Sequence, residues 1–133
     1  MCSSDLVRPY IQLARLTPSA EAIQLLTRAA EIAPLNAEVA SERGRVWMAS
    51  GNAAQALGEF GRALALAPGV ARHVQNRGVA LLSLGQTDAA RVDFQHALES
   101  DPCLLPAREN LRRLGASLAP PPTQCLTTNS AAR

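Results

Sequence analysis

A period of 34 residues runs through this chain and constrains its fold more than any other feature. Small, aromatic and proline residues recur in the same order one period apart, which is typical of architectures built from stacked helical or strand units. The coinciding residues are Gly44 and Gly78, Gly51 and Gly85, Ala56 and Ala90, Phe60 and Phe94, Ala63 and Ala97, and Pro68 and Pro102.

A weaker copy precedes these two. One period further toward the N-terminus the alanines and the proline recur as Ala22, Ala29 and Pro34, but Leu26 replaces the phenylalanine and both glycines are missing. Three repeats are near the minimum that a stacked array needs for stability. We therefore expect a degenerate first repeat and two good ones, at residues 7–36, 37–70 and 71–104.

The repeated residue types predict two antiparallel helices, A and B, in each repeat. Alanines seven residues apart lie on one face of helix B, and the phenylalanine between them fills the space between helices. Gly44 and Gly78 are expected where helix A approaches helix B with no side chain between them. Arg43 and Arg77 fall on a nominally apolar position, so we expect their stems to pack while the guanidinium groups reach water.

Turn residues mark the predicted helix ends. Gly51 and Gly85 end each helix A because glycine adopts a positive φ at little cost, and a proline stops each helix B. Asn36 is the expected N-cap of the helix that follows it. Gly58 and Gly61 weaken the middle helix B, which indicates either a closely packed neighbour or a soft helix.

The segment after Pro102 departs from the repeat. Residues 105–115 predict one short helix with Leu111 and Leu114 on an apolar stripe and charged residues elsewhere, which suits a cap on a stack of repeats. Residues 116–133 contain three consecutive prolines and small polar residues, which predict a disordered tail.

The beginning of the chain has an unusual composition. Residues 1–6 match what a common sequencing-adapter end would encode in frame from a GTG start, so we expect a non-native leader and a gene cut upstream of Val7. The apolar residues that follow would then form an uncovered edge that invites self-association.

The period and the order of glycine, alanine, phenylalanine and proline resemble the tetratricopeptide repeat family, over about residues 7–115. Gly44 and Trp47 match the glycine and the aromatic residue of the family's helix A, and Gly78 and Leu81 match them more loosely. The first tryptophan and leucine of the family signature are absent. The resemblance implies an all-α fold, namely an α-solenoid of antiparallel helix pairs in a right-handed superhelix with a C-terminal capping helix.

Charge and cysteine content argue against several classes of protein. The formal net charge is +2 with both signs interspersed, which favours neither nucleic acid nor an anionic membrane as partner. Cys2, Cys103 and Cys125 share no metal-ligand or CxxC spacing, so we expect reduced thiols and a cytoplasmic protein. No segment approaches the roughly 18 apolar residues of a membrane span.

No motif indicates catalysis, a metal or a cofactor, and we expect none of the three. The chain lacks GxSxG, HExxH, P-loop and GxGxxG patterns. His73 and His96 stand apart on different predicted helices, where surface histidine is the better interpretation. Asp88, Asp93 and Glu109 are expected as solvated carboxylates on helix surfaces.

In the family that the chain resembles, helices A line a concave face, which implies a groove for a peptide segment of another protein. The residues that face this groove by their helical positions are Glu38, Glu42, Arg45, Arg72, Gln75, Asn76, Glu109 and Arg113. An ordinary solvated face is the alternative for each of them. Mixed charges in such a groove would suit a partner with both signs, held partly through Arg–carboxylate forks.

Other functions remain open. Family members that clamp a chaperone's C-terminal carboxylate use two Lys, two Asn and one Arg, and only Asn76 and Arg72 could fit that set. The repeats could instead be the non-catalytic segment of a larger enzyme, such as a glycosyl- or sulfotransferase, or could self-assemble through the N-terminal edge. Base-by-base RNA reading does not fit the period of 34 or the near-neutral charge.

Overall fold

A computed structural model describes residues 3–126 of the 133-residue chain. This part folds into seven α-helices and one further helical turn at residues 123–126, and contains no strand, as the all-α prediction requires. The helices are α1 (Ser3–Leu16), α2 (Ser19–Ile32), α3 (Ala37–Ala49), α4 (Ala53–Leu66), α5 (Ala71–Ser83), α6 (Thr87–Ser100) and α7 (Leu105–Arg113).

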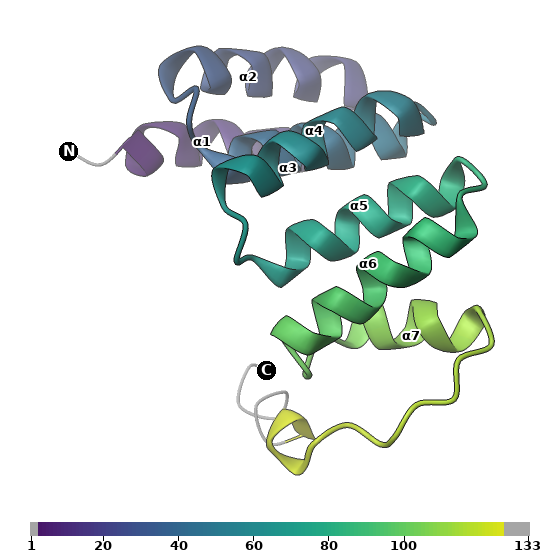
Figure 1. Cartoon of the computed structure of the whole chain (residues 1–133). Coiled ribbons are helices and arrows are strands. Elements are labelled where there is room, and N and C mark those ends of the chain that lie inside the picture. The colour runs from purple at the N-terminus through teal and green to yellow at the C-terminus, as the bar shows by residue number, and fades with distance from the viewer. Residues whose placement is uncertain (1–2, 127–133) are drawn as a thin grey trace.

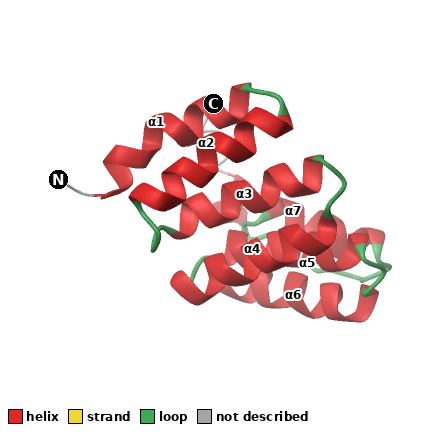
Figure 2. Ribbon diagram, turned by 90° about the horizontal axis from the view of Figure 1, so that it is seen from above, coloured by secondary structure: helices red, strands yellow, loops and turns green. Residues whose placement is uncertain are grey.

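The helices stack as antiparallel pairs, α1 with α2, α3 with α4, and α5 with α6, and α7 closes the stack (Figure 1). Each helix packs mainly on its neighbours in sequence, and α1, α3 and α5 also contact one another in succession. Seen from above, short loops join the members of each pair (Figure 2). This arrangement is the helical-repeat solenoid that the period predicts. Helix α1 begins at Ser3, so the structure continues it into the expected leader, whose origin stays a hypothesis.

A close approach of two helices fixes the spacing inside the second and third pairs. A Cβ added at Gly44 would lie 2.5 Å from the ring of Phe60, and one at Gly78 would lie 2.7 Å from the ring of Phe94. Both rings are at most 1% exposed. The predicted role of these two glycines is therefore confirmed.

The alanines predicted to face the core do so. Ala56, Ala63, Ala90 and Ala97 are fully buried beside the two phenylalanines. In the first pair, which lacks these glycines, Leu26 takes the place of the ring and packs in a core that includes buried side chains of α1. Alanine on helix B thus lets the next helix approach closely in all three pairs.

The predicted helix ends are also found in the structure. Gly51 and Gly85 adopt φ values of 82° and 80° just after α3 and α5, and Gly115 adopts 85° after α7. The Asn36 side chain accepts hydrogen bonds from the backbone N–H groups of Glu38 and Val39, at 2.9 and 3.2 Å. This N-cap satisfies two donors that the first turn of α3 would otherwise leave free.

Two ion pairs one period apart join helix A to helix B, so the arginine heads, expected to reach water, also bind carboxylates on helix B. Arg77 Nε and Nη2 each donate to Asp93 at 2.8 Å, and Asp93 is only 4% exposed. Arg43 Nη1 lies 3.4 Å from Glu59 Oε1 at the equivalent place. Asp93 is therefore not the solvated carboxylate that we expected, because the packed stem of Arg77 brings its fork onto α6. The hydrogen bond to Asp93 raises the pKa of Arg77.

Two of the three cysteines differ from the prediction of reduced, unpaired thiols, and the third, Cys2, lies outside the described residues. Cys103 and Cys125 form a disulfide that closes a loop of 22 residues. Sequence spacing could not indicate this bond, because the intervening chain turns back across α7 before it returns to Cys103. The expectation of a cytoplasmic location rested on unpaired thiols and loses that basis, since disulfides persist mainly in oxidising compartments.

The segment after α7 also differs from the predicted disordered tail. Residues 116–126 run back along α7 to the disulfide (Figure 1). Leu114, Ala116 and Leu118 pack against the core formed by α6 and α7. Residues 127–133 of the predicted tail lie outside the described part.

We predict that Gly44→Ala and Gly78→Ala each lower the free energy of unfolding by about 1–3 kcal/mol, because the new methyl group collides with a buried ring. Gly58→Ala is the matched control. A Cβ at Gly58 meets nothing within 4 Å, so the same change there should stabilise α4 by roughly 0.4–1 kcal/mol. Urea denaturation followed by circular dichroism measures all three, and equal effects at Gly44 and Gly58 would contradict the close-approach interpretation.

We further predict that Asp93→Asn costs about 1–2 kcal/mol of unfolding free energy, because it removes the charge from a buried carboxylate that holds both arms of Arg77. The partial exposure of Arg77 keeps the loss below that of a fully buried pair. Asp88→Asn on the same helix is the control, since that side chain is 98% exposed. Chemical denaturation at pH 7 compares the two, and a similar loss in both variants would show that the Arg77 pair adds nothing.

Candidate functional site

The first helices of the three pairs enclose a groove with a volume of about 500 Å³. Helices α1, α3 and α5 form its walls, and the start of α7 closes one end. We use "the groove" for the hollow bounded by Arg15, Glu38, Ser41, Glu42, Arg45, Val70, Arg72, His73, Gln75, Asn76, Leu104 and Pro106.

The six residues that we predicted on helices A all line this groove. They come from one face of α3 and the corresponding face of α5, and they are Glu38, Glu42, Arg45, Arg72, Gln75 and Asn76. The two residues predicted on the capping helix do not line it. Glu109 instead pairs with Arg113 at 3.2 Å on the exposed surface of α7.

One glutamate organises the positive charge at the end of the groove formed by α1 and α3. Glu42 is only 6% exposed and accepts hydrogen bonds from both Arg15 and Arg45. Arg45 Nη1 donates to Glu42 Oε2 at 2.8 Å, and Arg15 Nε donates to Oε1 at 3.1 Å. The hydrogen bond to Glu42 raises the pKa of Arg15. Glu42 therefore positions two guanidinium groups and is too buried to be the open contact that we expected.

The other end of the groove is more open to a ligand. Arg72 on α5 is exposed there, whereas the exposed Glu38 lies 3.6 Å from Arg15, beside the Glu42 cluster. The part of the chain that the structure describes shows no hydrogen bond or ion pair of Arg72. Asn76 donates to Ser41 Oγ at 3.4 Å, which links α5 to α3 across the groove. Arg72 is thus the guanidinium with its donors available to a bound carboxylate.

The groove floor holds two buried polar side chains. Gln75 and His73 are each 7% exposed, so His73 is not the surface histidine that we predicted, whereas His96 is exposed. His73 Nδ1 is buried and has no hydrogen-bond partner among the described residues. Burial, and next the positive charge of Arg72, lower the pKa of His73, although Glu38 opposes the shift. The floor beside Arg72 is therefore neutral at pH 7.

Sequence reasoning missed Arg15, which crosses from α1 to Glu42. The first repeat is degenerate, so its helix A offered no aligned position from which the direction of Arg15 could be inferred. Leu104 and Pro106 were also missed, because they belong to the connection into α7 and not to a repeated helix face.

The groove offers hydrogen-bonding and charged groups but no site for a metal. Across residues 3–126, no group of three or more His, Cys, Asp and Glu side chains could hold an ion. None of the described helices is long and apolar enough to cross a membrane.

Comparison with known proteins agrees with this geometry. The sequence model of the tetratricopeptide repeat matches residues 74–102, which include most of α5 and α6. A comparison with curated protein sequences finds no significant match.

Many solved structures share the fold. The Arabidopsis OM64 tetratricopeptide repeat domain is similar with a TM-score of 0.78 and 23% identity, over 84% of this chain and 93% of that one. The first such domain of Spaghetti (RPAP3), bound to the HSP90 peptide SRMEEVD, has a TM-score of 0.72 and 22% identity, over 85% of this chain and 87% of that one. The Thermobaculum terrenum O-GlcNAc transferase has a TM-score of 0.76 and 26% identity, over 84% of this chain but 22% of that one. The chain therefore has the fold of a tetratricopeptide repeat domain, and its residues 74–102 match the sequence model of this repeat.

Proposed function

We propose that this chain is a non-catalytic interaction scaffold that binds a peptide segment of a partner protein in the groove. The observation that supports this most is the groove itself, a hollow of about 500 Å³ lined by charged and amide side chains from four helices. Peptide binding by the similar RPAP3 domain supports the same proposal for a chain of this fold.

The charges of the groove suggest how a peptide would be oriented. Arg15 and Arg45 already share Glu42, so a ligand gains little by competing for them. Arg72 has its donors available, and the exposed Glu38 lines the same groove, 3.6 Å from Arg15. A peptide with an acidic residue at Arg72 and a basic residue at Glu38 would pair with both.

The ligand differs from the carboxylate of a chaperone tail. The clamp used for that group needs two Lys, two Asn and one Arg, and the groove supplies only Asn76 and Arg72 toward it. The near-neutral charge of the chain also favours a protein partner over nucleic acid.

A second candidate function is that these repeats are the non-catalytic segment of a larger enzyme. The observation that favours it is the similarity to the O-GlcNAc transferase, of which the chain spans only 22%. Sequencing the source DNA on both sides of this reading frame tests it. A catalytic domain in frame would support the candidate, and nearby start and stop codons would exclude it.

Self-association through α1 is a third candidate. Leu6, Leu13 and Leu16 are 48%, 49% and 84% exposed on this first helix. Such exposed leucines favour contact with another apolar surface. Light scattering tests this, because a constant monomer mass at high concentration would exclude it.

The groove proposal predicts that Arg72→Glu weakens binding at least tenfold, a loss of about 1.4 kcal/mol. The change replaces an available donor fork with a repelling carboxylate while leaving the Glu42 cluster intact. Arg28→Glu is the control, since Arg28 is exposed on α2, outside the groove, and the charge change is the same.

The measurement uses peptides selected from a displayed random library against the wild-type chain, with affinities from fluorescence anisotropy. Both variants should keep the wild-type helicity. Selected peptides that bind Arg72→Glu as tightly as wild type would place their site outside the groove.

A further inference from the structure

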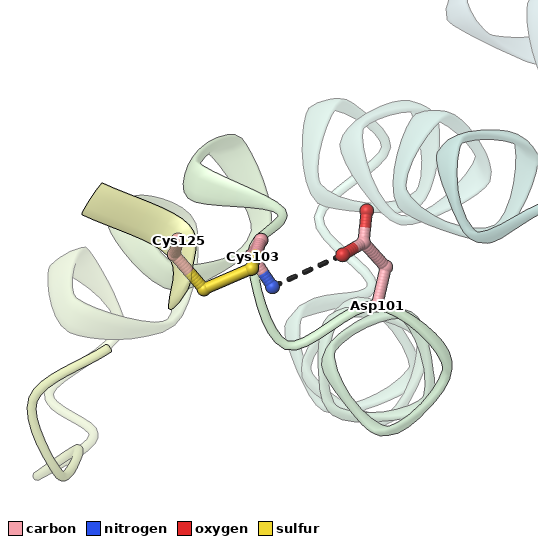
Figure 3. The surroundings of a disulfide bond; sticks show 3 residues. All are labelled: Asp101, Cys103 and Cys125. Carbon is pink, nitrogen blue, oxygen red and sulfur yellow. Dashed lines mark hydrogen bonds between the residues drawn. A yellow bond between two sulfur atoms is a disulfide. The ribbon is translucent and has the colours of Figure 1, made fainter. Parts of the chain in front are cut away.

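The segment that follows α7 is held against the stack by one covalent bond. We call residues 116–126 the strap. Its Cys125 is bonded to Cys103 with a Cα–Cα distance of 5.0 Å (Figure 3). Cys103 itself is fixed by its backbone N–H, which donates to Asp101 Oδ1 at 3.0 Å. The bond therefore joins the strap to the turn between α6 and α7.

Hydrogen bonds and a small apolar contact also hold the first part of the strap. Ala116 N–H donates to Leu111 O at 3.0 Å, and the Arg108 guanidinium donates to Ala119 O. Ala116 and Leu118 pack on the core of α6 and α7, but most of the later strap residues are exposed. A segment with so little buried apolar surface opens easily once its covalent attachment is lost.

The bond lies beside the groove. Leu104, the neighbour of Cys103, lines the groove together with Pro106 at the start of α7. Leu104 N–H also donates to Asp101 O at 3.1 Å, within the same turn. Any loosening of this turn would therefore alter the end of the groove that α7 forms.

The two cysteines differ in exposure. Cys125 is 2% exposed, whereas Cys103 is partly exposed. An incoming thiolate would attack Cys103 Sγ and form a mixed disulfide there, and Cys125 Sγ would leave as the thiolate. This asymmetry makes the bond open to a small dithiol despite the burial of one partner.

We propose that Cys103–Cys125 is a redox-controlled clasp that holds the strap on α7 and braces one end of the groove. A dithiol reductant opens it. Two electrons and two protons pass to the cysteine pair, the dithiol becomes a disulfide, and both cysteines become thiols. Opening frees the strap and loosens the turn at Leu104, so the oxidised chain has the better-formed groove.

The test uses a Cys2→Ser background, so that Cys103 and Cys125 are the only thiols. Thiol titration of the denatured protein should find none after oxidation and two after dithiothreitol treatment. Hydrogen exchange of residues 112–126 should become at least tenfold faster on reduction. The released strap would break hydrogen bonds such as that from Ala116 N–H to Leu111 O more often. Residues 37–66, in α3 and α4, are the internal control and should change less than twofold. The melting temperature should fall by about 5 °C or more.

Cys125→Ser in the same background provides the matched variant. It should show the fast strap exchange without reductant, and dithiothreitol should change nothing further. The clasp proposal would be wrong if two titratable thiols remained after incubation with oxidised glutathione. It would also be wrong if the hydrogen-exchange rate of the strap were the same before and after reduction.

The effect on the groove rests on the function proposed above and has its own readout. Affinity for the library-selected peptides should fall about three- to tenfold on reduction. If no peptide binds to the oxidised or the reduced chain, the scaffold proposal is wrong, and the hydrogen-exchange data still test the clasp. If peptides bind equally in both states while the strap is released, the bracing of the groove is wrong.

Discussion

The contact between a glycine of helix A and the ring of a phenylalanine on helix B is the constraint on which the rest of this solenoid depends. At Gly44 and Gly78 no Cβ can be accommodated without moving a buried ring. The two helices can therefore lie close together, and the phenylalanine fills the space on either side of the bare backbone. Because the second and third pairs share this spacing, they stack in the same way and their helices A align on one side.

A second interaction with the same period reinforces the first. The pairs Arg77–Asp93 and Arg43–Glu59 join helix A to helix B at equivalent places. The first is a two-armed fork on a buried carboxylate, and the second is a single, longer contact. Asp93 Cβ lies near the space that a side chain at Gly78 would need, so the ion pair and the close approach occupy adjacent volume. Gly78 thus allows both the Phe94 ring and the Asp93 carboxylate to approach helix A.

What the sequence could predict follows from whether a signal repeats. The glycines, alanines and phenylalanines recur every 34 residues, so their burial could be inferred, and six groove residues followed from the same helix geometry. The burial of each groove side chain could not be inferred, because it depends on contacts outside its own repeat, such as that of Arg15 on α1 with Glu42. The disulfide joins Cys103, whose type does not recur one period earlier, to Cys125 beyond the repeats, across a return of the chain that no local pattern encodes. The missed features therefore include single long-range contacts such as the disulfide, and also the periodic Arg77–Asp93 ion pair, whose partner no helix pattern names.

The Cys103–Cys125 disulfide can affect the groove because a solenoid is a linear stack of helix pairs. Each helix pair packs mainly on its neighbours, so stability and order pass along the stack through successive interfaces. A change at α7 is felt first by α6 and by the turn that carries Leu104, and only weakly by α1. The cluster of Arg15, Glu42 and Arg45 lies at the other end of the groove and should keep its geometry when the clasp opens. Binding groups at the two ends of the groove would then respond differently to oxidation, since one end is fixed by a charged cluster and the other by a covalent bond.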